Sequence, residues 1–396
     1  MHRRPLLPLL LFVPALALAQ RTPFTVDDLL MLDRISGLDV DPTWRYALFN
    51  VRATDMEKNK GVSSLWLKDL GAPTTPEVRL AVSDSGAAGA QWGPDGKSIF
   101  FLSGRGGGHS MQVWTTDIAG SQARQVTRLP LDVGAFRITP DGTGLVLSMA
   151  VLPSVKGDEP GLTAQWREKK KMGSGSVYDK VFVRHWDEWA DGTRNHLFHV
   201  DIASGKVTAL TQDYDGDVPS KPFGDENDFW IAPDSKTVYF SARLAGTTEP
   251  WSTNFDVYSV AITGGALTNL TASNPAWDAN PCVSPDGRTL AYKAMKRPGF
   301  EADRFELRLR DLGTGAVTPL VPGWDRSVDQ MTWSHDGKSL LVTADDLGKH
   351  KLFSIDAKSG AVTALSKDGH IDAFRWTPKG FVFLKSALNS PAVLYA

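Results

Sequence analysis

The sequence predicts an all-β protein, and three observations point to a β-propeller of seven four-stranded antiparallel blades. A short Pro-Asp-Gly turn recurs along the chain, apolar strands follow each copy, and a second hairpin follows those strands. The composition agrees, since 36 glycines, 24 prolines and 13 tryptophans are typical of many short strands joined by tight turns. A pair of β-sandwiches is the alternative that strand alternation alone allows.

The recurring turn consists of a bulky residue, a small residue, Pro, Asp, Gly and a basic residue. Its clearest copies are 92–97, 283–288 and 333–338. Weaker copies are centred on Pro42, Pro140, Pro233 and Pro378. Proline presets φ, Asp bonds back to the backbone and Gly takes a positive φ. Successive centres lie 43 to 52 residues apart, with one interval of 93. Because a period of about 40–50 residues with four strands is typical of a propeller blade, seven turns predict seven blades.

A second hairpin follows the first in each period and ends in a strand resembling Val-Thr-x-Leu. Clear examples are 197–211, 257–271 and 352–365. Seven inner hairpins but six outer ones can be counted, so the last blade is expected to stop at its third strand, 392–396. The residues before Leu38 resemble a helix, so we do not expect an N-terminal strand to complete this blade. The chain is therefore expected to be a truncated product.

The long interval contains an insertion, which we expect to form one arm of about residues 154–195. It begins with a polar loop and a short helix around 166–171. The candidate substrate-binding residues of the arm are Arg184, His185, Trp186, Asp187, Glu188 and Trp189. Insertions in repeat proteins often reach toward a ligand, and this mixture suits a small charged molecule, with indole walls and carboxylates for an amine. The alternative is a solvated hairpin whose tryptophans pack on the blade edge.

Residues 1–19 are expected to be a secretory signal peptide, leaving a propeller domain at 20–396. Arg3 and Arg4 precede an apolar run that ends in the small-x-small site at 17–19. An uncleaved membrane anchor is the alternative. We therefore expect a periplasmic or secreted protein with no membrane contact after cleavage. A net charge of −2 excludes nucleic-acid binding by bulk electrostatics.

No catalytic or metal centre can be assembled from the sequence. The segment 108–112 comes closest to a Gly-x-Ser-x-Gly nucleophile elbow, but it lacks the final glycine. The single cysteine, Cys282, excludes a disulfide framework and a cysteine-built zinc site. Asp213, Asp215 and Asp217 have the spacing of a calcium loop without the glycine and glutamate of an EF-hand, and an inter-blade turn is the alternative. We expect no cofactor.

Several of these motifs resemble the prolyl oligopeptidase family of serine peptidases, in particular its bacterial dipeptidyl-peptidase and acylaminoacyl-peptidase branch. The likeness rests on an opening helix at 25–30, the Ser-Pro-Asp-Gly turns, and the segments 184–189 and 249–254. It implies that the chain is an N-terminal propeller half, which caps an α/β-hydrolase domain and admits short peptides. The hydrolase half does not follow in this sequence, so we expect this chain alone to be inactive.

The resemblance also implies roles for the arm. Glu188 and Asp187 would bind the α-amine of a peptide, Arg184 would orient a carbonyl, and Trp186 and Trp189 would line the entrance. The alternative function is a free-standing TolB-like propeller that binds a protein or envelope partner without catalysis. Such a propeller would complete its last blade and would not need the arm.

Overall fold

The computed structural model describes residues 23–106, 110–153, 160–169, 175, 177–179, 181–221, 224–244, 246–378 and 380–396. In this part of the chain antiparallel strands dominate, and the only α-helices are α1 (Val26–Met31) and α2 (Pro160–Lys169). The prediction of an all-β protein is thereby confirmed. None of the described helices is long and apolar enough to cross a membrane. The expected leader, residues 1–19, lies outside the described residues.

Most strands follow one another in groups of four, and five such groups form separate antiparallel sheets. The first two sheets contain β1 (Arg34–Val40), β2 (Tyr46–Asp55), β3 (Lys60–Asp69), β4 (Val78–Arg79), β5 (Ala88–Trp92), β6 (Ser98–Ser103), β7 (Gln112–Asp117) and β8 (Arg124–Gln125). The third contains β9 (Phe136–Ile138), β10 (Gly144–Val151), β13 (Arg194–Asp201) and β14 (Val207–Ala209). The next two contain β15 (Phe229–Ile231), β16 (Thr237–Arg243), β17 (Phe255–Ala261), β18 (Thr268–Asn269), β19 (Asp278–Val283), β20 (Thr289–Ala294), β21 (Glu306–Asp311) and β22 (Val317–Pro319).

The remaining large sheet has seven strands. It contains β23 (Val328–Trp333), β24 (Ser339–Asp346), β25 (Lys349–Asp356), β26 (Val362–Ala364), β27 (His370–Thr377), β28 (Gly380–Ala387) and β29 (Ser390–Tyr395). The first four strands are antiparallel, as are the last three, and the two groups join through one parallel pair, His350 and His370. The inserted arm adds a two-stranded hairpin of β11 (Arg184–His185) and β12 (Glu188–Trp189).

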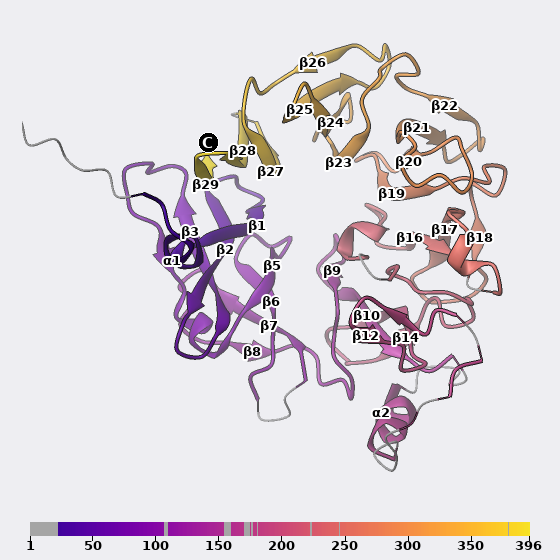
Figure 1. The fold of residues 1–396 in the computed structure, drawn as a ribbon, viewed down its shortest axis with the longest axis horizontal. Helices are drawn as coiled ribbons and strands as arrows, with labels where there is room; N and C mark the ends of the chain where they lie inside the picture. The colour runs from indigo at the N-terminus through magenta and orange to yellow at the C-terminus, as the bar shows by residue number, and fades with distance from the viewer. Residues whose placement is uncertain are drawn as a thin grey trace, which may run out of the picture.

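The strand groups follow one another around a central space, so that β27–β29 return to the side of β1–β3 (Figure 1). There Leu38 of β1 packs against Val382 and Leu384 of β28 in one buried cluster. An ion pair of 3.2 Å between Arg375 Nε and Asp39 Oδ1 joins the same two regions. The hydrogen-bonded partner of β1 is β2, so side chains rather than a shared strand bring the two ends of the ring together.

The recurring turns connect the first and second strands of their groups, as the sequence predicts. In the turn between β5 and β6, Asp95 Oδ1 accepts the backbone N–H of Ser98 at 2.9 Å, and Gly96 has a φ of 63°. Two weaker copies of the turn place Trp44 and Ser235 at positive φ values of 57° and 59°. Each of these residues stands where the clear copies have glycine, and a residue with a side chain adopts the left-handed region at a conformational cost. The two turns therefore lack the glycine that marks the motif in the sequence.

The start of the chain differs from the expectation that the residues before Leu38 are helical. The helix α1 ends at Met31, and β1 begins at Arg34. Ile35 pairs with Val51 of β2 in an antiparallel register, so pairing with an established strand overrides the local helical pattern.

The helix of the arm begins earlier than expected, at Pro160 rather than near residue 166. Proline is favourable in the first turn of a helix because the missing N–H has no partner there. Thr163 is fully buried and its hydroxyl accepts the backbone N–H of Leu152 at 3.0 Å. Ala164 packs on an apolar cluster that the second and third sheets share, so α2 lies against the body of the protein.

Candidate functional site

The arm carries the six predicted substrate-binding residues on one short hairpin. Arg184 of β11 lies opposite Trp189 of β12, and Trp186 and Asp187 form the turn between the strands. The guanidinium of Arg184 lies 5.9 Å from the centre of the Trp189 ring and donates a hydrogen bond to the carbonyl of Trp186. The hairpin therefore holds a cation against an indole beside a turn that carries a carboxylate.

The tip of this hairpin is open to solvent. Trp186 and Trp189 are 68% and 65% exposed, and Asp187 and Glu188 are exposed as well, whereas His185 is partly buried. Large exposed indoles are unusual on a protein surface and are typical of binding sites. The tip thus presents two carboxylates and two aromatic surfaces to any ligand that approaches it.

A buried ion-pair network lies at the base of the arm, where the chain enters β13. Arg194 Nη1 donates to Asp217 Oδ2 at 2.7 Å and to Glu249 Oε1 at 3.0 Å, and Nη2 donates to Glu249 Oε2 at 3.0 Å. Asp217 lies between β14 and β15, and Glu249 begins the 3₁₀ turn η4 (Glu249–Trp251) between β16 and β17. One guanidinium therefore ties three separate connections together.

Because the network is buried, its charged side chains stabilise the fold only together. The side chains of Asp217 and Glu249 are 6% and 8% exposed, so each carboxylate depends on its partner. Burial lowers the pKa of the Arg194 guanidinium, but the bonds to Glu249 and Asp217 outweigh that effect and the net shift is upward. Nothing in the sequence around Arg194 predicts this role, because a contact between residues 55 positions apart leaves no local pattern.

The acidic stretch at 213–217 uses one of its carboxylates in this network. Besides Arg194, Asp217 accepts the backbone N–H of Asn195 at 2.8 Å and lies 3.4 Å from Lys221 Nζ. Within the residues that the structure describes, no group of three or more His, Cys, Asp and Glu is arranged to hold a metal ion. Asp217 therefore has a role in holding the protein together.

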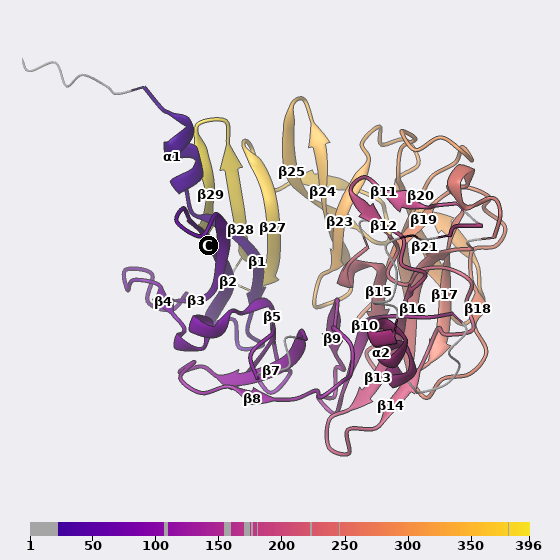
Figure 2. The ribbon, with the colours of Figure 1, turned by 60° about the horizontal axis from the view of Figure 1, so that its bottom comes forward.

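The connections between the second and third strands of the groups carry many of the exposed apolar side chains. These residues are Met56, Trp186, Trp189, Leu244, Trp251, Phe300, Leu347 and Leu388. Figure 2 shows that the β11–β12 hairpin and the connections β24–β25 and β28–β29 lie on the same side of the molecule. We call this side the loop face. Among the described residues, the Pro-Asp-Gly turns at the other end of the strands carry none of the large exposed apolar side chains.

A cavity of about 970 Å³ occupies the centre of the ring. Its walls include residues of β1, β5, β9, β15, β19, β23 and β27, the innermost strands of the successive groups. Arg137 Nε donates to the carbonyls of Glu226 and Phe229 at 2.7 and 2.8 Å and so fixes one side of the wall. The hairpin residues 184–189 do not line this cavity.

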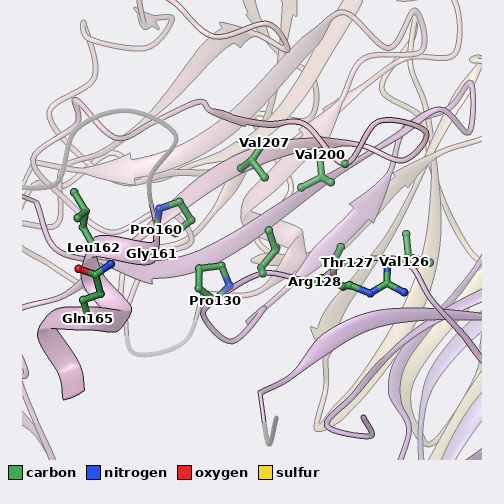
Figure 3. Close-up of a pocket in the computed structure, with 12 residues that line it drawn as sticks. Val126, Thr127, Arg128, Pro130, Pro160, Gly161, Leu162, Gln165, Val200 and Val207 are labelled. Carbon is green, nitrogen blue, oxygen red and sulfur yellow. The ribbon is translucent and has the colours of Figure 1, made fainter. Parts of the chain in front are cut away.

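A smaller cavity of about 460 Å³ lies at the rim, where α2 meets the body (Figure 3). Pro160 and Leu162 of α2, Pro130 of the β8–β9 connection, and Val200 and Val207 of the third sheet line it. The lining is mainly apolar and again excludes the predicted substrate-binding residues. This cavity lies where the helix of the arm meets the third sheet.

Comparison with curated proteins identifies relatives over most of the chain, although no family model matches it. Dipeptidyl-peptidase 5 of Porphyromonas gingivalis is 27% identical over 345 residues, which cover 86% of this chain and 48% of that protein. Dipeptidyl-peptidase 5 of Porphyromonas endodontalis is 31% identical over 304 residues, which cover 75% and 42%. The chain spans about half the length of the curated relatives it matches.

Solved structures show which half this is. The β-propeller domain of the Trilobed protease from Pyrococcus furiosus, described as having an open velcro topology, matches with a TM-score of 0.60 at 14% identity, over 91% of this chain and 92% of that domain. The chain is a propeller half related to dipeptidyl-peptidase 5. The acylaminoacyl peptidase of Pyrococcus horikoshii matches this propeller half with a TM-score of 0.67 at 14% identity, over 93% of this chain and 51% of that protein. The resemblance predicted from the sequence motifs is confirmed.

Proposed function

We propose that this chain is the non-catalytic, substrate-gating propeller of a secreted serine exopeptidase that acts on short peptides. The observation that carries the proposal is the extent of the similarity, which covers 86% of this chain but only 48% of a dipeptidyl-peptidase 5. The signal-like residues 1–19 support secretion. Hydrolysis would require the remaining half of such a protein.

The strand groups support a ring of seven blades. Six groups have four strands, and the group β27–β29 has three within the described residues. The single parallel pair between β25 and β27 is then a contact between two neighbouring blades rather than the interior of one sheet. The last blade is, on this view, one strand short of the repeat.

The loop face supports docking of a second domain at this side of the ring. Trp251, Leu347 and Leu388 are 74%, 86% and 111% exposed, and large exposed apolar side chains that share one face are typical of an interaction surface. A domain seated there would also cover the arm. The arm would then border a closed space between the two domains.

Within that space, the hairpin is suited to the N-terminus of a peptide. Asp187 and Glu188 would bind the α-ammonium group, and Arg184 would orient a carbonyl of the peptide. The indoles of Trp186 and Trp189 would form apolar walls around the first side chains. Docking of a second domain would exclude water, which strengthens these charged contacts.

The test is a Glu188→Gln substitution in a protein that carries this propeller and a hydrolase half. We expect KM for substrates with a free amine to rise about tenfold with little change in kcat, because one charge-assisted contact is lost on binding. Substrates with a blocked amine should be unaffected.

Glu301→Gln is the matched control, since Glu301 is exposed in the β20–β21 connection of the same face. It should leave KM unchanged for both substrate types. An unchanged KM in Glu188→Gln would contradict the role of the hairpin. A rise of KM in both variants would indicate a general effect of surface charge.

A further inference from the structure

One sector of the central cavity has an aromatic wall. The wall consists of Phe255 at the start of β17, Trp277 just before β19 and Phe305 just before β21. The rings of Phe255 and Trp277 are stacked with centroids 4.6 Å apart, and Trp277 meets Phe305 edge-on at 5.7 Å. These contacts fix the three rings, so the wall is preformed for an apolar group.

A buried lysine faces the same sector. Lys293 of β20 lines the cavity, although only 7% of it is exposed. Its Nζ lies 4.8 Å from the ring centre of Phe305 and donates to the backbone carbonyl of Asp329 at 2.9 Å. Among the described residues, no carboxylate oxygen lies within 4.0 Å of this nitrogen. A buried ammonium without a carboxylate partner is unusual, because burying an unpaired charge is costly.

Three carboxylates, Asp329, Asp228 and Asp225, act electrostatically on the lysine, and each of them has a partner of its own. Asp228 Oδ2 accepts the backbone N–H and the hydroxyl of Ser220 at 2.9 and 2.8 Å, and burial raises the pKa of Asp228 to about 6. Asp329 Oδ2 lies 3.5 Å from His350 Nε2. Burial lowers the pKa of Lys293 and outweighs the opposing effect of Asp329, Asp228 and Asp225; a bound anion would act in the same direction as these carboxylates.

We propose that this aromatic–lysine sector, formed by Phe255, Trp277, Lys293 and Phe305, binds the carboxylate of a small organic acid with an apolar body. The carboxylate would accept hydrogen bonds from Lys293 Nζ, which has three donors and uses one on a backbone carbonyl. The apolar body would lie against the three rings. This site is separate from the exposed hairpin at 184–189 and does not depend on the function proposed for it.

Such an acid could be a free metabolite or the C-terminus of a short peptide, and calorimetric titration of this chain distinguishes the two. The probes are 3-phenylpropionate, N-acetylphenylalanine and the methyl ester of each. We expect one or both acids to bind, and each methyl ester to bind at least about tenfold more weakly, the effect of one charge-assisted contact. The acid that binds more tightly identifies the source. Equal binding of acid and ester, or no binding of either acid, would overturn the proposal.

Variants of the chain give a second test. Lys293→Met should weaken acid binding about tenfold or more, whereas Lys293→Arg should retain part of it. Lys338→Met is the matched control, since Lys338 is 79% exposed in the turn between β23 and β24, and it should bind as the parent does. Unchanged binding in Lys293→Met would overturn the proposal. The comparison of acid with ester uses the parent chain and therefore does not depend on the folding of any variant.

Discussion

The tip and the base of the arm differ in the burial of their charged side chains. At the tip, Asp187 and Glu188 are exposed beside two exposed indoles, on a hairpin whose strands have only two residues each. At the base, Arg194 holds two carboxylates that are almost fully buried. Charges in water contribute little to folding, whereas buried charges must be paired. The difference indicates that the base sets the position of the arm and that the tip is available for binding.

The largest effect that separates the two regions is expected at the base. Arg194→Met leaves Asp217 and Glu249 buried without their main partner, and we expect a loss of about 3 kcal/mol in the free energy of unfolding. Urea denaturation measures it. Arg45→Met is the matched control, because the Arg45–Asp69 pair lies at the surface and its loss should change the free energy of unfolding far less than Arg194→Met does.

Glu249→Gln in the Arg194→Met background checks the mechanism. Removing the stranded negative charge should recover part of the lost stability, since the penalty arises from an unpaired buried carboxylate. If the double variant were less stable than Arg194→Met by the full cost of a second independent substitution, the two residues would not be coupled and the base would not be a single unit.

A smaller effect is expected at a buried carboxylate that forms no ion pair with any of the described residues. Asp278 is fully buried, Asn274 Nδ2 donates to its Oδ1 at 2.8 Å, and burial raises its pKa to about 7. The folded protein then binds a proton between about pH 4 and pH 7 that the unfolded chain releases, so stability falls as pH rises through this window.

Asp278→Asn removes that titration. Its unfolding free energy, relative to the parent, should increase by about 1–2 kcal/mol between pH 6 and pH 8. The exposed turn residue Asp286 is the control: its hydrogen bond with Ser284 lowers its pKa, so this carboxyl is ionised in both the folded and the unfolded chain over the range measured, and Asp286→Asn should show no pH dependence there. A difference for Asp278→Asn that does not vary with pH would show that this carboxyl titrates as in the unfolded chain.

The sequence predicted what is encoded locally and missed what depends on distant contacts. Turns such as that at Asp95 and Gly96 recur in the chain, and the recurrence alone predicted the sheet architecture. The hairpin at 184–189 was found from its residue types. By contrast, Arg194 and Lys293 have ordinary neighbours in the sequence, and their properties come from burial and from partners on other strand groups, Glu249 for Arg194 and the carbonyl of Asp329 for Lys293.

The smallest effect on stability is expected at the tip itself. It decides whether the hairpin serves binding or is a solvated hairpin whose tryptophans pack on the blade edge. Trp189 is 65% exposed and contacts Tyr178 at a centroid distance of 6.1 Å. If the tip serves binding, Trp189→Ser should change the unfolding free energy by less than about 0.5 kcal/mol, as for other exposed positions. Trp333→Ser, at a tryptophan only 8% exposed, should cost about 3–5 kcal/mol in the same measurement. A comparable loss at Trp189 would show instead that the hairpin packs on the blade edge, because only buried indoles contribute that much to folding.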